Sequence, residues 1–426
     1  MDINNELSMN IVLYVNSFLP DIGGREMVIN YLARSFVRLG HQVRVVGPAG
    51  YRYRRQDNYG FPIHRYPVIG SMKLWRKGEG FAFDESITKT PSRVKIQEVL
   101  EYWQLKYDLI RWGADVVHAH NTYPTGYAAI RYKHNHKLPL VITPHGEDIH
   151  KIPEISFGLR LNALLAKRIL ASLDHAELCT AISEGVEDSL LSAGAKPNKI
   201  RRIPNGVDTE RFNGDLKLNI RQWLKISDDA RMLVSVGNYH PRKGHEVIIR
   251  AMPAILQNEP RAHLVIVGRN PESLQPLVDE LGIGQHVSLT GPIAVPVFTG
   301  STDEANSDND YLATLLRYSE MYISAGIDEG AEGLSLALLE GMAAQLPIVA
   351  TNISGNRDII FENENGKLVP PGDIDALSTA INSLLSDESN RKRIGNNAKE
   401  FAADFDWDVI AEKYIEVYKE AIELTK

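Results

Sequence analysis

The sequence predicts an α/β protein built from two doubly wound domains, and three observations support this. Apolar runs of strand length alternate with amphipathic segments of helix length, as in parallel sheets covered by helices. The alternation starts twice, at NIVLYV (Asn10 to Val15) and at MLVSVG (Met232 to Gly237). The chain has 426 residues, of which 43% are hydrophobic, which is long for one domain. We expect domains at residues 1–215 and 226–405, joined by the polar, turn-rich FNGDLKLNIRQWLKI.

The first series contains a strand at 10–15, a loop with Gly23 and Gly24, a helix ending at Leu39 before Gly40, and the strand QVRVV. Later strands are predicted at DVVHAH, PLVIT and KIRRIP. The second series contains MLVSVG, the helical VIIRAMPAIL, and the strands HLVIVG, HVSLTG, MYISAG and PIVAT. Open sheets of this kind bind ligands at the carboxyl ends of their strands, where loops lead into helix N-termini.

The final segment, FDWDVIAEKYIEVYKEAIE, has the periodicity of one amphipathic helix, with apolar positions at Ile410, Tyr414, Val417 and Ile422. Periodicity alone allows this helix to pack on either domain.

Composition and charge argue against several classes of protein. A formal charge of −7 argues against a dedicated nucleic-acid binder. Cys179 is the single cysteine, so no intrachain disulfide can form. The first residues, MDINNELSMN, lack the basic flank and apolar core of a signal peptide, and no apolar run reaches transmembrane length. Together these features predict a cytoplasmic protein.

Two glutamates bracket a run of small and apolar residues in EGLSLALLEGMAAQLPIVAT, Glu332 to Thr351. Pro347 and the strand after it fix the end of a helix, which must then start near Leu334 or Ser335. Glu332 is expected in the loop before this helix and Glu340 inside it.

The start of that helix suits a phosphate or diphosphate, because its first backbone N–H groups are unpaired and its dipole is positive there. Gly333 keeps the backbone open for close approach, and a carboxylate accepts hydrogen bonds from two neighbouring hydroxyls. The pattern therefore indicates a nucleotide-sugar site. The alternative is that Glu332 only favours the helix start and Glu340 is a surface charge.

The same stretch, continued as GMAAQLPIVATNISGNRDII, resembles the retaining glycosyltransferases of family 4. The resemblance covers nearly the whole chain. In the first half it includes GGREMVINYLARSFVRLGHQVRVV, DVVHAH, TPHGEDI, CTAISEGV and IPNGVDTERF; in the second half it includes VGNYHPRKGHEVII, HVSLTGPI and ENGKLVPPGD. Each motif is weak alone, but their number, order and spacing are specific.

The resemblance implies the GT-B fold, in which two Rossmann-like domains face each other across a cleft and the last helix, here 406–426, crosses back to the first domain. It also implies transfer of a sugar from a nucleotide donor with retention of the anomeric configuration. No essential metal is expected, and the nucleotide sugar is a co-substrate rather than a resident cofactor.

By this resemblance the catalytic residues are His145, Lys243 and Glu332. Glu332 would contact the donor sugar, Glu340 the ribose hydroxyls, and Lys243 the leaving diphosphate, where one well-placed group can contribute ~3 kcal/mol. His145 would lie over the donor sugar. The remaining donor-binding positions are Gly23, Gly24, Asn238, Arg242, Gly291, Pro292, Gly333, Leu334 and Ser335. Ordinary turn chemistry is the alternative for Gly23 with Gly24 and for Gly291 with Pro292.

The chain departs from the family pattern at two positions. Asn238 stands where many members carry an arginine that holds the diphosphate, and adjacency suggests Arg242 as its replacement. Gln345 stands at a helix end where members often have glycine, which affects stability more than chemistry.

Two further groups of residues are ambiguous. The segment Ile293 to Tyr311, with acids Asp303, Glu304, Asp308 and Asp310, is expected to be a solvated, mobile insertion, with metal binding as the alternative. His118 and His120 alternate onto one face of a strand and could ligate zinc. Because the implied chemistry needs no metal, we favour a role for both histidines in lining the cleft or the acceptor site.

The segment Tyr51 to Gly78 holds seven basic residues against one acid, with Tyr and Trp interleaved. This composition suits a membrane headgroup layer or a lipid-linked pyrophosphate. A solvated loop is the alternative.

The sequence therefore predicts a retaining glycosyltransferase that uses a UDP-sugar, or next GDP-mannose, and a cell-envelope polysaccharide or glycolipid acceptor. One alternative is a non-catalytic nucleotide-sugar-binding subunit, and another is a nucleotide-sugar epimerase on the same fold. A dinucleotide dehydrogenase is disfavoured because neither half opens with G-x-G-x-x-G.

Overall fold

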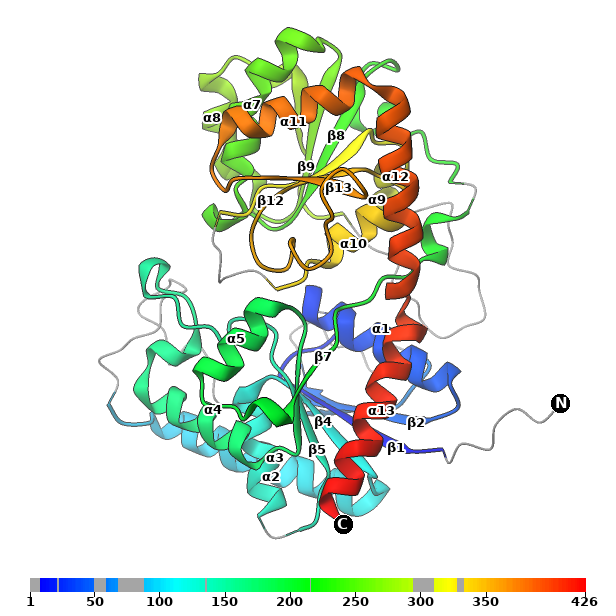
Figure 1. Ribbon diagram of the computed structural model, residues 1–426. Helices are drawn as coiled ribbons and strands as arrows, with labels where there is room; N and C mark the ends of the chain where they lie inside the picture. The colour runs from blue at the N-terminus through cyan, green and yellow to red at the C-terminus, as the bar shows by residue number, and fades with distance from the viewer. Residues whose placement is uncertain are drawn as a thin grey trace, which may run out of the picture. The chain divides into compact units, whose positions relative to one another are not determined.

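The computed structural model describes residues 8–20, 23–49, 59–67, 88–134, 136–214, 216–293, 310–327 and 333–426. Tertiary contacts divide the chain into two units (Figure 1). The first unit comprises residues 1–205 together with 407–426, and the second comprises residues 206–406.

The first unit is built on a seven-stranded sheet in the order β3-β2-β1-β4-β5-β6-β7, and every neighbouring pair is parallel. Its strands are β1 (Asn10–Val15), β2 (Gln42–Pro48), β3 (Ile63–Tyr66), β4 (Val116–His120), β5 (Leu140–Thr143), β6 (Leu178–Ala181) and β7 (Ile200–Arg202). Strands β1 and β4 are buried along almost their whole length, as expected for a sheet covered on both faces.

The second unit has a six-stranded parallel sheet in the order β10-β9-β8-β11-β12-β13. Its strands are β8 (Arg231–Val236), β9 (Ala262–Val267), β10 (Val287–Leu289), β11 (Met321–Ser324), β12 (Ile348–Thr351) and β13 (Gly366–Val369). In both sheets the order reverses beside the first strand, which is the arrangement of doubly wound folds. The expected fold class is confirmed.

Helices connect these strands. In the first unit they are α1 (Gly24–Arg38), α2 (Ser92–Trp112), α3 (Tyr127–Lys133), α4 (Ala163–His175), α5 (Glu184–Ser192) and α13 (Trp407–Thr425). In the second unit they are α6 (Ile220–Leu224), α7 (His245–Asn258), α8 (Gln275–Glu280), α9 (Tyr311–Arg317), α10 (Leu336–Ala343), α11 (Ile374–Ser386) and α12 (Glu388–Ala402). Two 3₁₀ turns, η6 (Glu210–Phe212) and η7 (Pro241–Lys243), carry residues of the candidate site.

The last helix, α13, returns to the first unit, as expected. Trp407 stacks on Tyr31 of α1, with ring centroids 5.5 Å apart and planes 8° from parallel. Asp408 pairs with Arg38 at the end of α1, and Tyr414 and other apolar residues of α13 are buried. The amphipathic pattern therefore reflects a helix that completes the first unit's packing.

The change from the first unit to the second follows Asn205, earlier than the polar composition of 212–226 indicates. Phe212, Leu216 and Ile220 are buried in the core of the second unit, which makes this segment part of that unit. Val207 forms an isolated bridge with Asp406, so the two ends of the second unit lie side by side.

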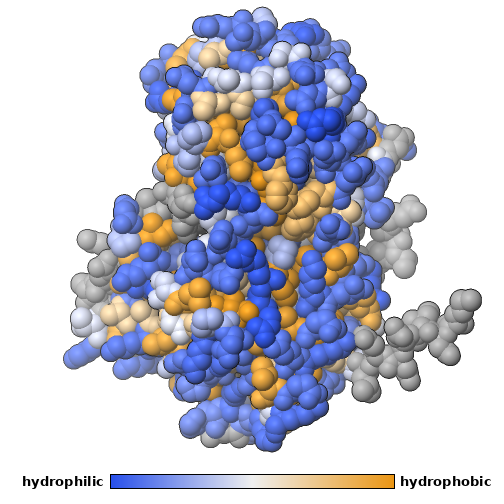
Figure 2. Space-filling model, in the orientation of Figure 1, coloured by the Kyte–Doolittle hydropathy of each residue, from blue (hydrophilic) through white to orange (hydrophobic). Residues whose placement is uncertain are grey.

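The visible surface of both units is predominantly hydrophilic, with hydrophobic residues in smaller patches (Figure 2). Within the described part of the chain, no helix combines the length and the apolar character needed to cross a membrane.

Candidate active site

Glycines follow three neighbouring strands of the second unit: Gly237 after β8, Gly268 after β9 and Gly291 after β10. The Gly268 N–H donates to the Gly291 carbonyl over 3.1 Å. A Cβ on Gly268 would overlap the Gly237 carbonyl oxygen, and the φ of +153° is one that other residues rarely adopt. Three backbones therefore approach closely at the carboxyl edge of the sheet.

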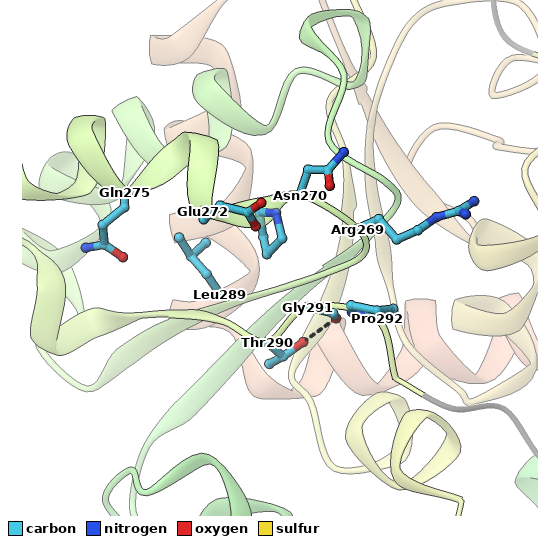
Figure 3. A pocket seen from close by; sticks show the side chains of 9 residues that line it. Arg269, Asn270, Glu272, Gln275, Leu289, Thr290, Gly291 and Pro292 are labelled. Carbon is cyan, nitrogen blue, oxygen red and sulfur yellow. Dashed lines mark hydrogen bonds between the residues drawn. The ribbon is translucent and has the colours of Figure 1, made fainter.

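A pocket of about 520 Å³ opens at this edge (Figure 3). Its volume lies in the usual range for small-molecule sites. The Thr290 hydroxyl donates to the Gly291 carbonyl over 3.0 Å, and the predicted residues Gly291 and Pro292 form part of the lining. The complete lining is Arg269, Asn270, Pro271, Glu272, Gln275, Leu289, Thr290, Gly291 and Pro292.

Lys243 lies in the turn η7 between β8 and α7. The following residue, Gly244, has a φ of +66°, and a Cβ there would overlap the Ala325 carbonyl oxygen after β11. The turn is thus fixed against the end of β11. A Cβ placed on Gly237 would lie 3.7 Å from Lys243 Cδ, so the lysine side chain passes over the end of β8.

Asn238 and Arg269 tie two neighbouring loops together. The Asn238 Oδ1 accepts hydrogen bonds from the backbone N–H of Arg269 at 2.9 Å and from its Nε at 3.3 Å. Asn238 therefore orients an arginine that lines the pocket, and in Figure 3 the Arg269 side chain points away from Gln275. Sequence reasoning missed Arg269, because only the fold brings the end of β9 beside Asn238.

Arg242, suggested from adjacency as a replacement for the family arginine, lies beside Lys243 in η7. Its backbone carbonyl accepts from the Ile327 N–H over 2.9 Å. Its part in diphosphate binding stays a prediction.

Glu340 lies inside α10, as predicted, and belongs to a charged trio with Arg211 and Asp310. Arg211 donates from Nη1 to Glu340 Oε1 over 2.7 Å, and from Nε and Nη2 to the Asp310 oxygens over 2.6 and 3.0 Å. Burial raises the pKa of Glu340, Arg211 acts against this rise, and the Asp310 charge adds to it. Arg211 therefore holds the glutamate in place and favours its ionised form.

Sequence reasoning missed the role of Arg211, although the residue lies in the quoted motif IPNGVDTERF. The acidic segment was expected to be solvated, but its residue Asp310 is 4% exposed and caps α9 by accepting from the Ala313 N–H. The other named acids, Asp303, Glu304 and Asp308, lie outside the described residues.

Helix α10 begins at Leu336, with Ser335 as its N-cap residue, which confirms the predicted start. The Ser335 side chain makes no capping hydrogen bond, so it leaves the first backbone N–H groups to other acceptors. Leu334 is buried in the core of the unit. The Gly333 carbonyl packs against Gly355, at 2.6 Å from where a Cβ of that residue would lie. Glu332 lies outside the described residues.

In the first unit, His120 and His145 are brought together at the ends of β4 and β5. Their Nδ1 and Nε2 atoms lie 3.0 Å apart, so one ring donates a hydrogen bond to the other. The His145 N–H donates to Asp148 Oδ1 over 2.8 Å. Burial lowers the pKa of His120 to about 3 and that of His145 below its ordinary value, so both rings are neutral near pH 7.

His118 is completely buried, and both of its ring nitrogens are engaged. Nδ1 lies 2.6 Å from the Tyr418 hydroxyl of α13, and Nε2 lies 2.6 Å from the Thr143 hydroxyl. These bonds give His118 a packing role under the last helix. Within the described ranges, no three His, Cys, Asp or Glu side chains gather in a way that could hold a metal ion.

Gly23 and Gly24 lie at the start of α1, where Gly23 is the N-cap residue. A Cβ on Gly23 would lie 2.5 Å from Glu26 Oε2, whereas one on Gly24 would meet nothing within 4 Å. Arg25 donates to Asn121 after β4 over 3.3 Å and lowers the pKa of both His120 and His145 by its charge. This arginine, in the quoted motif GGREM, is a further polar group near the histidine pair.

Most of the segment Tyr51 to Gly78 lies outside the described residues, so the predicted membrane contact there stays a prediction. Of its basic residues, Arg65 is described. Its guanidinium donates to the Pro48 and Leu19 carbonyls and lies over the Phe18 ring, which gives this residue a structural part in the first unit.

Comparison with known proteins finds matches to both halves of the chain. A model described as Glycosyltransferase Family 4 matches residues 22–211, and one described as Glycosyl transferases group 1 matches residues 230–387. An uncharacterized glycosyltransferase of Methanocaldococcus jannaschii is 26% identical over 98% of this chain and 99% of its own length. A GDP-mannose-dependent alpha-(1-6)-phosphatidylinositol monomannoside mannosyltransferase of Mycobacterium tuberculosis is 29% identical over 58% of this chain and 63% of its own length.

Solved structures share the fold at low sequence identity. A sucrose-phosphate synthase from Thermosynechococcus elongatus has a TM-score of 0.74 at 20% identity, with 96% of this chain and 98% of that one covered. Anabaena HepE, solved in complex with UDP, has a TM-score of 0.73 at 18% identity, with 96% of this chain and 100% of that one covered. With both sheets, both family models and these relatives in agreement, the chain belongs to the family 4 glycosyltransferases and has their GT-B fold.

Proposed function

We propose that this glycosyltransferase is a retaining, metal-independent enzyme that moves a sugar from a nucleoside-diphosphate donor to a cell-envelope polysaccharide or glycolipid. The observation that carries the proposal lies in the second unit. There, one sheet edge has the Gly291 and Pro292 pocket at the end of β10 and the Lys243 side chain over the end of β8. A pocket for a base beside a cation for phosphates is the arrangement that a nucleoside diphosphate requires.

In this proposal each group has one task. The pocket takes the base, and the Glu340 carboxylate accepts hydrogen bonds from two ribose hydroxyls while Arg211 holds it in place. Lys243 and the N-terminus of α10 stabilise the diphosphate as it leaves, when its negative charge grows. Arg269, oriented by Asn238, supplies a second cation near the phosphates. His145 and Glu332 keep their predicted roles at the donor sugar.

For the donor we favour a UDP-sugar, with GDP-mannose next. A solved structure of the same fold contains UDP, and a curated relative is described as GDP-mannose-dependent. For the acceptor, that relative acts on a phosphatidylinositol mannoside, in keeping with a glycolipid or polysaccharide of the envelope.

The first test measures nucleoside diphosphate released from UDP-, GDP- and ADP-sugars by purified protein. We expect release from one donor class, and a decrease of about 10²–10³-fold in Lys243→Ala, because that variant loses a charge placed on the leaving group. Lys392→Ala is the matched control, since Lys392 is 72% exposed on α12 of the same unit and should leave the rate unchanged.

Donor binding is measured in parallel by calorimetry. Saturable binding without release, in the presence of lipid and glycan acceptors, would favour a non-catalytic binding subunit and contradict the proposal. Retention of configuration and independence from metal are measured separately. The anomeric configuration of the product, read by NMR, must match that of the donor, and turnover must survive EDTA.

A further inference from the structure

Helix α2 (Ser92–Trp112) has its polar and apolar sides reversed relative to an ordinary surface helix. Its buried side carries four polar residues, Gln97, Glu98, Glu101 and Asp108, beside Val94, Leu105 and Leu109. A helix on a globular protein normally directs its charged residues to water and its apolar stripe to the core. Two features need an explanation: the polar residues on the buried side of the helix and the apolar residues on its exposed side.

The outward side carries an apolar stripe of five large residues that are between 42% and 67% exposed: Ile96, Val99, Trp103, Tyr107 and Ile110. Their spacings of three and four residues place them on one face. At 1.5 Å per residue the stripe runs for roughly 20 Å. Exposed large hydrophobic residues elsewhere in the described chain, such as Val37, Leu191 and Leu424, occur singly or nearly so, which is ordinary for a protein surface.

All three acidic side chains of α2 point inward, where hydrogen bonds and ion pairs stabilise them. Glu98 accepts hydrogen bonds from Arg168 Nε and the Tyr123 hydroxyl, each over 2.8 Å. Asp108 pairs with Arg44 at 2.7 Å and lies 3.2 Å from His64.

Glu101 accepts from Gln97 over 3.1 Å, and burial raises its pKa to about 8. It is therefore largely protonated near neutral pH. Within α2, whose residues are all described, no acid reaches the outward side.

The bases of α2, in contrast, all flank the stripe. Arg93 and Lys95 are exposed near the start of the helix, and Arg111 is exposed near its end. The Lys106 ammonium lies 4.9 Å from the Trp103 ring centre, and the Arg111 guanidinium lies 5.2 Å from that of Tyr107. At 100° per residue, Lys95 and Lys106 lie on one side of the stripe and Arg93 and Arg111 on the other.

We propose that this outward face of α2 docks on an anionic lipid surface, with the helix lying in the headgroup layer. An apolar stripe flanked by bases on both sides matches the two layers of such a surface, acyl chains below and negative headgroups above. Trp103 and Tyr107 are residue types enriched at membrane interfaces. The acids that would repel anionic headgroups are buried beneath the helix, so apolar contact and charge attraction act together.

The helix also borders a small cavity. The cavity has a volume of about 230 Å³ and opens beside Tyr107 and Arg111, with Arg44, His64 and the Asp108 carboxylate that pairs with Arg44 on its other walls. Arg131 of the neighbouring helix α3 lies 5.6 Å from the Tyr102 ring centre. With Arg131, positive charge continues from α2 onto α3, which extends the surface that anionic lipid can contact.

The test is flotation of the full-length protein with vesicles of phosphatidylcholine alone or with anionic phosphatidylglycerol added. We expect binding to the anionic vesicles that weakens as salt rises. Trp103→Ser with Ile110→Ser should lower the partition coefficient by more than about tenfold, because two exposed apolar side chains that would enter the lipid layer are lost. The matched control, Leu191→Ser with Leu424→Ser, removes exposed apolar residues of α5 and α13 and should bind like the parent.

A second double variant tests the contribution of the lysine charges beside the stripe. Lys95→Gln with Lys106→Gln should weaken binding to anionic vesicles by about fivefold per lysine and leave binding to neutral vesicles unchanged. The control is Lys392→Gln with Lys419→Gln. Circular dichroism and thermal melting show that each variant is folded.

Three outcomes would overturn the proposal. One is the absence of binding to anionic vesicles. A second is equal binding by the α2 variants and the parent, which would assign docking to another surface such as the segment 51–78. The third is a concentration-dependent dimer in sedimentation that Trp103→Ser with Ile110→Ser abolishes, since the face would then be an interface between copies of the chain.

Discussion

Glu340 shows how one residue's chemistry depends on partners that are distant in sequence. Its side chain is 19% exposed, and this partial burial by itself favours the neutral form, whereas its contact with Arg211 favours the charged form. Arg211 in turn is shared with the buried Asp310. Burial and the neighbouring Asp310 charge together outweigh Arg211, so the pKa of Glu340 stays above that of an ordinary glutamate.

This shift predicts a pH dependence of donor binding. An ionised Glu340 can accept hydrogen bonds from two ribose hydroxyls, whereas the protonated form loses part of that capacity. Affinity for the nucleoside diphosphate should therefore fall as pH is lowered through the raised pKa. Calorimetric titrations from about pH 8 to about pH 5 measure this change.

In Glu340→Gln the affinity should be weaker at the upper end of that range and nearly independent of pH. Glu388→Gln, at an exposed position on α12, is the control and should retain the parent's profile. A pH profile in Glu340→Gln identical to that of the parent would assign the titration to another group.

Much of the candidate site could be proposed from residue patterns, because Lys243, Glu340, Gly291 and Pro292 each lie in a short motif. Arg211 and Arg269 could not be assigned their partners in this way. Arg211 meets Glu340 only when η6 and α10 pack together, and Arg269 meets Asn238 only when the ends of β8 and β9 are adjacent. Ion pairs and hydrogen bonds between distant parts of a fold leave no local spacing to recognise.

At the scale of elements, the strands that are buried on both faces were predicted well. β1 occupies Asn10–Val15, the residues of the predicted NIVLYV strand. The short strands β3 (IHRY) and β13 (GKLV) were missed, since polar residues or glycine interrupt their apolar character. Helix α2 was also missed, and periodicity alone would not have revealed that its apolar stripe faces outward.

The end of α10 gives a prediction about stability. Gln345 has a φ of +69°, a left-handed conformation that helices often adopt just past their last turn and that glycine tolerates best. Gln345→Gly should be more stable than Gln345→Ala by about 1 kcal/mol, since alanine retains the Cβ that is strained there. Thermal melting should separate the two variants by roughly 2–4 °C.

The comparison of Gly with Ala, rather than with the parent, removes the contribution of the hydrogen bond from the Gln345 amide to Asn396, which both variants lack. Equal melting temperatures would mean that the backbone relaxes out of the left-handed region at little cost.

For the whole molecule, two domains and the return of the last helix were anticipated, but the position of the unit boundary was not. The segment 212–226 is polar enough to resemble a linker, yet its few apolar residues insert into the second unit's core. Burial of Phe212, Leu216 and Ile220 outweighs the turn-forming character of their neighbours.

We expect residues 206–406, expressed alone, to fold and to bind nucleoside diphosphate with an affinity within about tenfold of the full chain. The segment is continuous, has its own sheet and core, and contains Lys243, Glu340 and the Gly291 pocket. Calorimetry on this fragment, with its Lys243→Ala form as the control, measures the affinity. A folded fragment that does not bind would show that donor binding requires residues of the first unit.

The bridge between Val207 and Asp406 has a consequence for how such chains can be recombined. The first and last residues of the second unit are neighbours. That unit is therefore one continuous insertion in the sequence of the first unit, which resumes at Trp407. Exchange of 206–406 between family members would require two junctions that touch each other and would leave the packing of α13 on α1 intact. Donor preference could then be exchanged between family members as one contiguous segment of the gene, while the first unit kept its own sequence and surface.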